Sequence, residues 1–169
     1  ITIHLAEEAA DVRRRALESA AYACTSEVLD ALEVAYYDED EKMRISAVLG
    51  MGRSCDKRWE PIILHEMESA SPAMRYEAIW ASGELTLRQA VPTLSRFVHD
   101  PDRQVSNASI WALGQIGGSQ AKEILLDAFD EADDDMQLAL DEALAELALA
   151  DGDLDFLLYD LDDEDALLP

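Results

Sequence analysis

Length, composition and charge limit what this chain can be. Its 169 residues, 49% of them hydrophobic, are enough to build a sizeable core, and no apolar run reaches the roughly 18 residues that span a membrane. The formal net charge is −24, which removes the electrostatic attraction to phosphate that nucleic-acid binding requires, so we expect no nucleic-acid partner.

The first residues of the chain bear on the length of the natural array and on the localisation of the protein. Residues 1–11 resemble the end of a second helix of a preceding repeat, so we expect the natural array to be longer. They do not have the basic-then-apolar order of a signal peptide. We therefore expect one soluble, cytoplasmic domain over residues 1–169 without a membrane partner.

A repeat of 31 residues organises nearly the whole chain. Val12, Met43, Met74, Val105 and Met136 occupy one column, and each begins a similar segment. The repeats are residues 12–42, 43–73, 74–104, 105–135 and 136–165. Because a period of 20 to 50 residues is typical of stacked repeats, the pattern predicts an all-α, right-handed α-α superhelix, a solenoid of about five helix-turn-helix repeats.

The third repeat shows how one unit is built. Met74 to Leu85 has the apolar spacing of a helix, and the next residues predict a short turn. Pro92 lies in the opening turn of a second helix, which we expect to stop at the segment His99-Asp-Pro-Asp102. A glycine column, Gly52, Gly83 and Gly114, predicts close approach of a neighbouring helix.

These motifs carry a family resemblance. The pattern V/M-R-x-x-A-x-x-A-x-G and the closing D-P-D look like HEAT repeats. The segments SIWALGQIGGSQAKEILLDAF and EAIWASGELTLRQAVPTLSRFVHDPD resemble the short HEAT-like units named after phycobilisome lyases, and the resemblance covers about residues 12–160. It implies an armadillo-like fold that serves mostly as a protein-binding scaffold. Ala21 and Asp141 depart from the pattern, as expected of end repeats.

The resemblance also implies a binding surface. If second helices line the concave face, as in the arrays this chain resembles, their exposed positions form a mixed strip suited to a peptide or helix of a partner. Its main residues are Ile62, His65, Glu66, Thr93, Arg96, Phe97, Ile124 and Asp127. The other positions are Ala31, Val34, Ala35, Asp38, Ser69, Asp100, Ala128, Glu131, Asp155, Leu158, Tyr159 and Asp162. Trp80 and Trp111 form a second column, expected to pack between repeats or to offer a further anchor surface.

The distribution of charge suggests the kind of partner. Residues 1–122 hold all 13 basic residues and 19 acids, whereas residues 123–169 hold 18 acids and neither Lys nor Arg. A basic protein or a divalent cation would be attracted to this acidic end. Adaptation of the host to high salt would give the same acidic composition without a basic partner. Separately, an end repeat could stack on another copy of the chain. The sequence leaves both of these alternatives open.

Enzymatic functions find less support in the residues. Of several His-Glu pairs used by the HEAT-like iron hydroxylase, only His65-Glu66 is present. Bilin lyases, which attach or isomerise a tetrapyrrole, remain the alternative function, by analogy alone. HEAT-like DNA glycosylases are disfavoured, because they require a basic face and this chain is acidic. We therefore expect a non-enzymatic scaffold with no cofactor.

Three smaller features are better explained by structural roles than by metal binding or catalysis. The acidic segment 151–162 fails the EF-hand pattern, with Phe156 at the glycine position and Asp162 at the glutamate position, so we expect no metal site. The arginine column that includes Arg44 is expected to bond turn aspartates and carbonyls. Cys24 and Cys55 are expected to be small buried side chains too far apart for a disulfide, since neighbouring helices lie about 8–10 Å apart.

Overall fold

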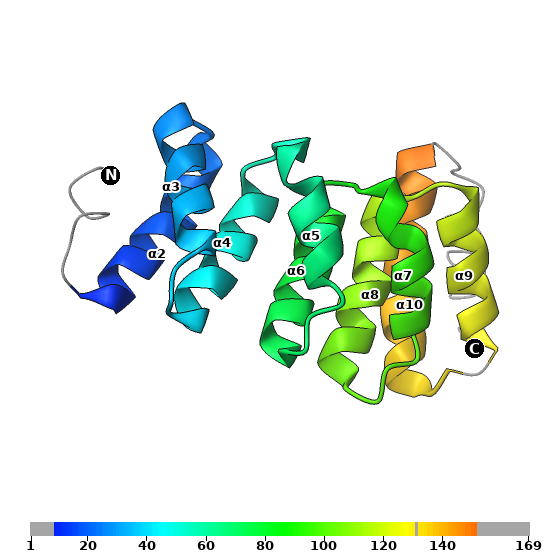
Figure 1. The fold of residues 1–169 in the computed structure, drawn as a ribbon. Helices are drawn as coiled ribbons and strands as arrows, with labels where there is room; N and C mark the ends of the chain where they lie inside the picture. Colours follow the sequence, from blue (N-terminus) through cyan, green and yellow to red (C-terminus); the bar gives the residue numbers. More distant parts are fainter. Residues whose placement is uncertain (1–8, 131, 152–169) are drawn as a thin grey trace, which may run out of the picture. The chain divides into compact units, whose positions relative to one another are not determined.

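The fold is built from helices throughout the part of the chain that can be described. The computed structural model describes residues 9–130 and 132–151, and this part contains no strand (Figure 1). The predicted all-α class of helical repeats is confirmed. The chain divides into two compact units, Ile1–Ala90 and Val91–Pro169. The expected second helix of the fifth repeat lies outside the described residues.

The first unit holds two complete helical pairs and a further first helix. Its helices are α2 (Ala10–Ala20), α3 (Ser26–Tyr36), α4 (Glu41–Arg53), α5 (Glu60–Glu66) and α6 (Pro72–Glu84). Short 3-10 turns follow the three first helices, at Ala21–Ala23, Lys57–Trp59 and Arg88–Ala90. First helices pack on one another, α2 on α4 and α4 on α6, while α3 packs on α4 and α5 on α6.

The second unit repeats this arrangement. It contains α7 (Val91–Phe97), α8 (Arg103–Ile116), α9 (Ser119–Phe129) and α10 (Asp134–Asp151). The first helices α8 and α10 pack together, and α8 also packs against α7 and α9. The predicted helix over Met74–Leu85 is observed as α6, which begins two residues earlier because Pro72 occupies its opening turn. Pro92 likewise lies in the opening turn of α7, as predicted.

The core of each unit consists of the inward columns of the repeat. In the first unit Val48 and Ile79 are fully buried, and Ile110 holds the same column in the second unit. Leu32 and Ile63 contribute the second-helix side of the first core. Since such side chains lose all contact with water, the 31-residue pattern in the sequence corresponds to the buried surface between neighbouring helices.

Aspartates begin two of the described first helices, α4 and α8. The carboxylate of Asp40 accepts a hydrogen bond from the backbone N–H of Lys42 at 3.0 Å. Asp102 does the same for Gln104 at 2.9 Å. These bonds satisfy amide groups that have no partner inside the helix, so each aspartate fixes the residue at which its helix starts.

The arginine column has a structural role in the first unit. The guanidinium of Arg44 donates to the carbonyls of Asp38 and Glu39, at 2.9 and 3.1 Å. Arg75 makes the same pair of bonds one repeat later, to the turn before α6. The expected bonds to turn carbonyls are confirmed, whereas the hydrogen bonds described for these two arginines do not go to aspartate carboxylates. Each arginine holds the turn that precedes its own helix.

A left-handed residue follows the first helix of each of the first four repeats. Cys24, Cys55 and Thr86 have φ of 48°, 53° and 49°, and Gly117 has φ of 66° in the same column. The prediction that the two cysteines are buried is wrong, because both thiols are free and exposed. The reason is the left-handed backbone, which ends the helix and turns the side chain out of the core.

Two members of the glycine column, Gly52 and Gly114, have the expected cause. A Cβ added at Gly52 would lie 2.8 Å from Cα of Ala81 on the neighbouring first helix. In the second unit, a Cβ at Gly114 would lie 2.9 Å from the carbonyl oxygen of Ala143. Both obstacles are backbone or backbone-attached atoms, so these helices can approach closely only where a side chain is absent.

Glu77 provides a prediction for the pH dependence of stability. Burial raises the pKa of this carboxyl above its ordinary value of 4.5, Arg53 opposes the shift, and Glu18 adds to it. Because the folded pKa is the higher one, this group's stabilising contribution is complete below about pH 4 and is lost as the pH rises through the folded pKa. We expect Glu77→Gln to raise the free energy of unfolding at neutral pH by up to about 1 kcal/mol.

Denaturant unfolding at acidic and neutral pH would measure this effect. Glu84→Gln, an exposed position on the same helix, is the matched control and should change stability little at either pH. A Glu77→Gln protein that is less stable than wild type at neutral pH would contradict the prediction. In that case the attraction to Arg53 would outweigh the cost of burying the charge.

Candidate functional site

The predicted strip is distributed over three second helices. Ile62, His65 and Glu66 lie on α5 in the first unit. In the second unit, Thr93, Arg96 and Phe97 lie on α7, and Ile124 and Asp127 lie on α9, which contacts α7. His65, Arg96 and Asp127 are exposed and the other five are half-buried.

Two positions assigned to the strip are buried instead. Ala35 retains 8% of its accessible surface and Ala128 retains 2%. Each completes the inward stripe of its helix, seven residues after Val28 on α3 and after Ala121 on α9. Glu131, Asp155, Leu158, Tyr159 and Asp162 lie outside the described residues.

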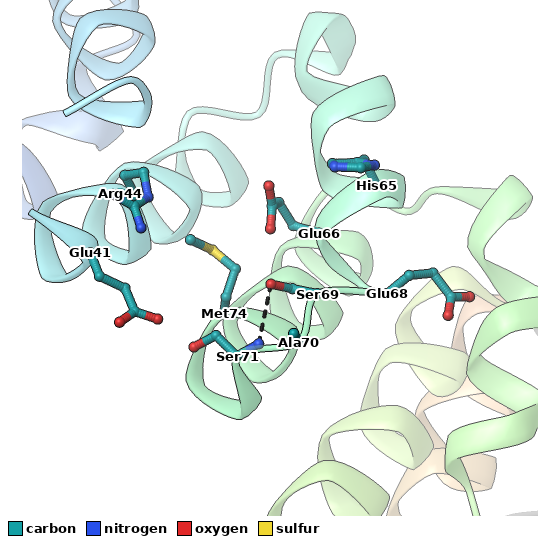
Figure 2. Close-up of a pocket in the computed structure, with 9 residues that line it drawn as sticks. All are labelled: Glu41, Arg44, His65, Glu66, Glu68, Ser69, Ala70, Ser71 and Met74. Atoms are coloured by element: carbon teal, nitrogen blue, oxygen red, sulfur yellow. Dashed lines mark hydrogen bonds between the residues drawn. The ribbon is translucent and has the colours of Figure 1, made fainter. Parts of the chain in front are cut away.

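His65 and Glu66 on α5 border a hollow of about 460 Å³ in the first unit. Figure 2 shows Glu66 extending towards Met74, with Arg44 on the facing helix and Glu68 pointing away beyond the turn. Thus α4, α5, the following turn and α6 all contribute to one surface. Its residues are Glu41, Arg44, His65, Glu66, Glu68, Ser69, Ala70, Ser71 and Met74.

Hydrogen bonds fix two charged groups of this hollow. The hydroxyl of Tyr36 on α3 donates to Oε1 of Glu66 at 2.6 Å, joining successive repeats. Burial and the neighbouring carboxylate raise the pKa of Tyr36, so the phenol stays protonated and keeps donating. Arg44 is held by the turn carbonyls. Glu66 and Arg44 are therefore oriented in advance, whereas the side chains of Glu41 and His65 are exposed.

A second hollow, of about 380 Å³, occupies the equivalent place one repeat earlier. Arg13, Val34, Ala35, Asp38 and Met43 precede Arg44, His65, Glu66, Ser69 and Met74 by 31 residues in each case. Its other lining residues are Leu17, Glu27, Asp30 and Ala31. The surface is more apolar here, since Val34 replaces the imidazole and is 74% exposed. The hollow is thus a property of the repeat.

Both hollows carry more acid than base. Three carboxylates and one arginine line each of them, with His65 in addition in the first one described, where the carboxylate of Glu68 points away. Because Arg44 already donates to two carbonyls, part of its capacity is used within the protein. A cationic side chain is the complementary ligand for such a surface.

The repeat character is also found by comparison with known proteins. A family model for HEAT repeats matches residues 60–145, about half of the chain. The chain belongs to the HEAT repeat family. The alternating helices, aspartate caps and glycine column described above are thus features of HEAT repeats in this chain.

A solved structure has the same fold. The chain is similar to a chain in the complex of CpcE and CpcF of phycocyanin lyase from Nostoc sp. PCC7120, with 20% sequence identity and a TM-score of 0.69. The match covers 87% of this chain and 63% of that chain, so this HEAT array spans less than two thirds of its length. The search of curated proteins gave no match. At this identity the likeness concerns the fold alone.

The two tryptophans lie on first helices of different units. Trp80 on α6 and Trp111 on α8 are both half-buried. Trp80 packs edge-to-face with Tyr76, one helical turn earlier, at a ring separation of 6.3 Å. This contact is local to α6, and the role of the tryptophan column as a second surface stays a prediction.

Sequence reasoning about second helices missed part of the hollows. Glu41, Arg44 and Met74 come from the starts of first helices, and Tyr36 reaches Glu66 from the preceding repeat. The available signal was the 31-residue recurrence of arginine and methionine at those starts. Within residues 9–130 and 132–151, no three His, Cys, Asp or Glu side chains gather as metal ligands. No described helix is long and apolar enough to cross a membrane.

Proposed function

We propose that this HEAT array is a non-enzymatic scaffold that binds a basic protein or peptide segment along its second helices. The recurrence of one acidic hollow in two successive repeats is the observation that carries the proposal. An extended or helical segment can place successive side chains in successive hollows, so the repeat gives the partner two equivalent contacts.

We expect the two hollows to make different contacts with the partner, mainly apolar in the earlier repeat and mainly charged in the later one. In the earlier repeat, Val34 and Ala31 offer an apolar floor beside Asp30. In the later repeat, Glu66 is held by Tyr36 at 2.6 Å and is ready to accept a cation without further ordering. The preferred segment therefore has an aliphatic residue followed by Lys or Arg. The acidic residues 123–169 would steer such a partner towards the array.

The second unit has second-helix residues of its own that we include in the proposal. Its α7 exposes Arg96, whose guanidinium lies 6.0 Å from the ring centre of Phe97. On the neighbouring α9, Ile124 is half-buried and Asp127 is exposed. Arginine and aromatic side chains are frequent energetic anchors in interfaces, which supports including these residues in the proposed surface.

Selection from a displayed peptide library would test the scaffold proposal. We expect wild-type protein to enrich segments that combine an aliphatic residue with Lys or Arg, and Asp30→Lys/Glu41→Lys to bind them roughly tenfold more weakly at low salt. The two changed carboxylates are exposed and each lines one hollow. Fluorescence anisotropy with a selected, labelled peptide would give the two dissociation constants.

A charge-matched control separates the hollows from net charge. Glu33→Lys/Glu84→Lys changes two exposed acids of the same unit that line neither hollow. It should keep binding within about twofold, because distant exposed charges are screened by salt. Equal weakening of binding in both double variants would mean that net charge, and not the hollows, attracts the peptide. If no basic peptides were enriched, the proposed ligand class would be rejected.

A bilin lyase or a related accessory subunit is the alternative function. The structural likeness to the phycocyanin lyase complex favours it over other enzymatic possibilities. Incubation with a free bilin would distinguish the two functions, because a protein-bound tetrapyrrole has a shifted and intensified visible absorbance. A shift that the selected peptide does not compete away would favour the alternative.

A further inference from the structure

The two cysteines of the first unit lie at the ends of neighbouring first helices. Cys24 follows the 3-10 turn after α2, and Cys55 follows Ser54 at the end of α4. Both thiols are free and exposed. The Cys24 thiol donates a hydrogen bond to the carbonyl oxygen of Ser54 at 2.7 Å. That carbonyl belongs to the peptide bond that joins Ser54 to Cys55.

This contact limits the distance between the two cysteines. The 2.7 Å bond and two flanking spans of about 2.8 Å each place the Cα atoms no more than about 8.3 Å apart. Disulfides have Cα separations of about 4.4–6.8 Å. That limit lies above this range. Helix spacing describes the distance between helix axes, whereas both residues lie in turns beyond the helices and the Cys24 thiol already reaches the peptide of Cys55.

We propose that Cys24 and Cys55 form a dithiol that a low-molecular-weight disulfide oxidises to an intramolecular disulfide between the first two repeats. The Cys55 thiol loses its proton and attacks the small disulfide, which forms a mixed disulfide and releases one small thiol. The Cys24 thiol, already beside the peptide of Cys55, loses its proton and attacks the Cys55 sulfur. The second small thiol then leaves.

The reaction balances without another reagent. Two protein thiols lose two electrons and two protons, and the small disulfide takes up both to become two thiols. The new bond would link α2 to α4, the helices that carry Leu17 and Met43 of the earlier hollow. Formation of the bond does not depend on the proposed function. An effect of the disulfide on peptide binding would rest on the proposed function.

Oxidation with glutathione disulfide, followed by intact-protein and peptide mass spectrometry, tests the dithiol. We expect the wild-type chain to lose two hydrogens, to carry no glutathione, and to yield a Cys24–Cys55 linked peptide that dithiothreitol separates. Cys24→Ser and Cys55→Ser should each instead take up one glutathione. Circular dichroism of the reduced proteins would verify that both variants fold.

Two results would overturn the proposal. One is a wild-type protein that carries a glutathione on both cysteines, because the second thiol would then have failed to reach the first. The other is a disulfide that joins two chains while the intramolecular bond is absent at low protein concentration. Either result would mean that the thiols are modified independently.

Discussion

Replacing Ile63 by alanine is expected to lower the free energy of unfolding by about 2–5 kcal/mol. Ile63 lies on α5 with none of its surface accessible, so truncation would remove buried methyl groups and leave a cavity. Urea unfolding followed by circular dichroism would give the change.

The neighbouring isoleucine provides a matched control. Ile62 is half-buried and belongs to the predicted binding strip. Ile62→Ala removes the same atoms but is expected to cost less than about 1.5 kcal/mol, because water already reaches the side chain. It should weaken binding of a selected peptide where Ile62 takes part in the interface. Equal stability losses at both positions would contradict the assignment of Ile63 to the core and Ile62 to the surface.

Replacing Gly52 by alanine is expected to destabilise the protein by about 1–3 kcal/mol, even though alanine has the better helix propensity. The new methyl group would meet Cα and Cβ of Ala81, at 2.8 and 2.9 Å. These atoms cannot move without displacing α4 from α6. Thermal unfolding would record the loss, and Gly114→Ala should behave similarly in the second unit, where Ala143 is the obstacle.

Gly50 is the control for this prediction. It lies on α4 two residues before Gly52, and a Cβ there would meet the tip of the Leu32 side chain. A side-chain tip can rotate, whereas a backbone cannot, so Gly50→Ala should cost clearly less than Gly52→Ala. A larger loss at Gly50 would mean that core packing around Leu32 is more restrictive than the helix contact.

The sequence predicted features that recur with the repeat. The helix predicted over Met74–Leu85 is observed as α6, and Met74 and Leu85 are both buried. Asp40 and Asp102 cap helices where the turn sequences place them. These predictions succeeded because each depends on local structure, or on a contact that every repeat makes with its neighbours.

Predictions that treated one helix alone were less successful. Ala35 and Ala128 were placed on the surface because alanine is a weak marker of burial, and the structure shows that they complete inward stripes. The cysteines were placed in the core because their left-handed backbone was not recognised from a column that holds two cysteines, Thr86 and Gly117. Glycine alone would have indicated that conformation.

By itself, the sequence determined the helical repeat, its period, the capped turns, the inward columns and the second-helix residues worth testing. Only the tertiary structure decided that α4, α5 and α6 together form a hollow, that Tyr36 holds Glu66, and that the Cys24 thiol lies against the peptide of Cys55. The physical reason is that a periodic pattern reports which face of a helix is buried, whereas a hollow or a thiol contact depends on how neighbouring helices pack.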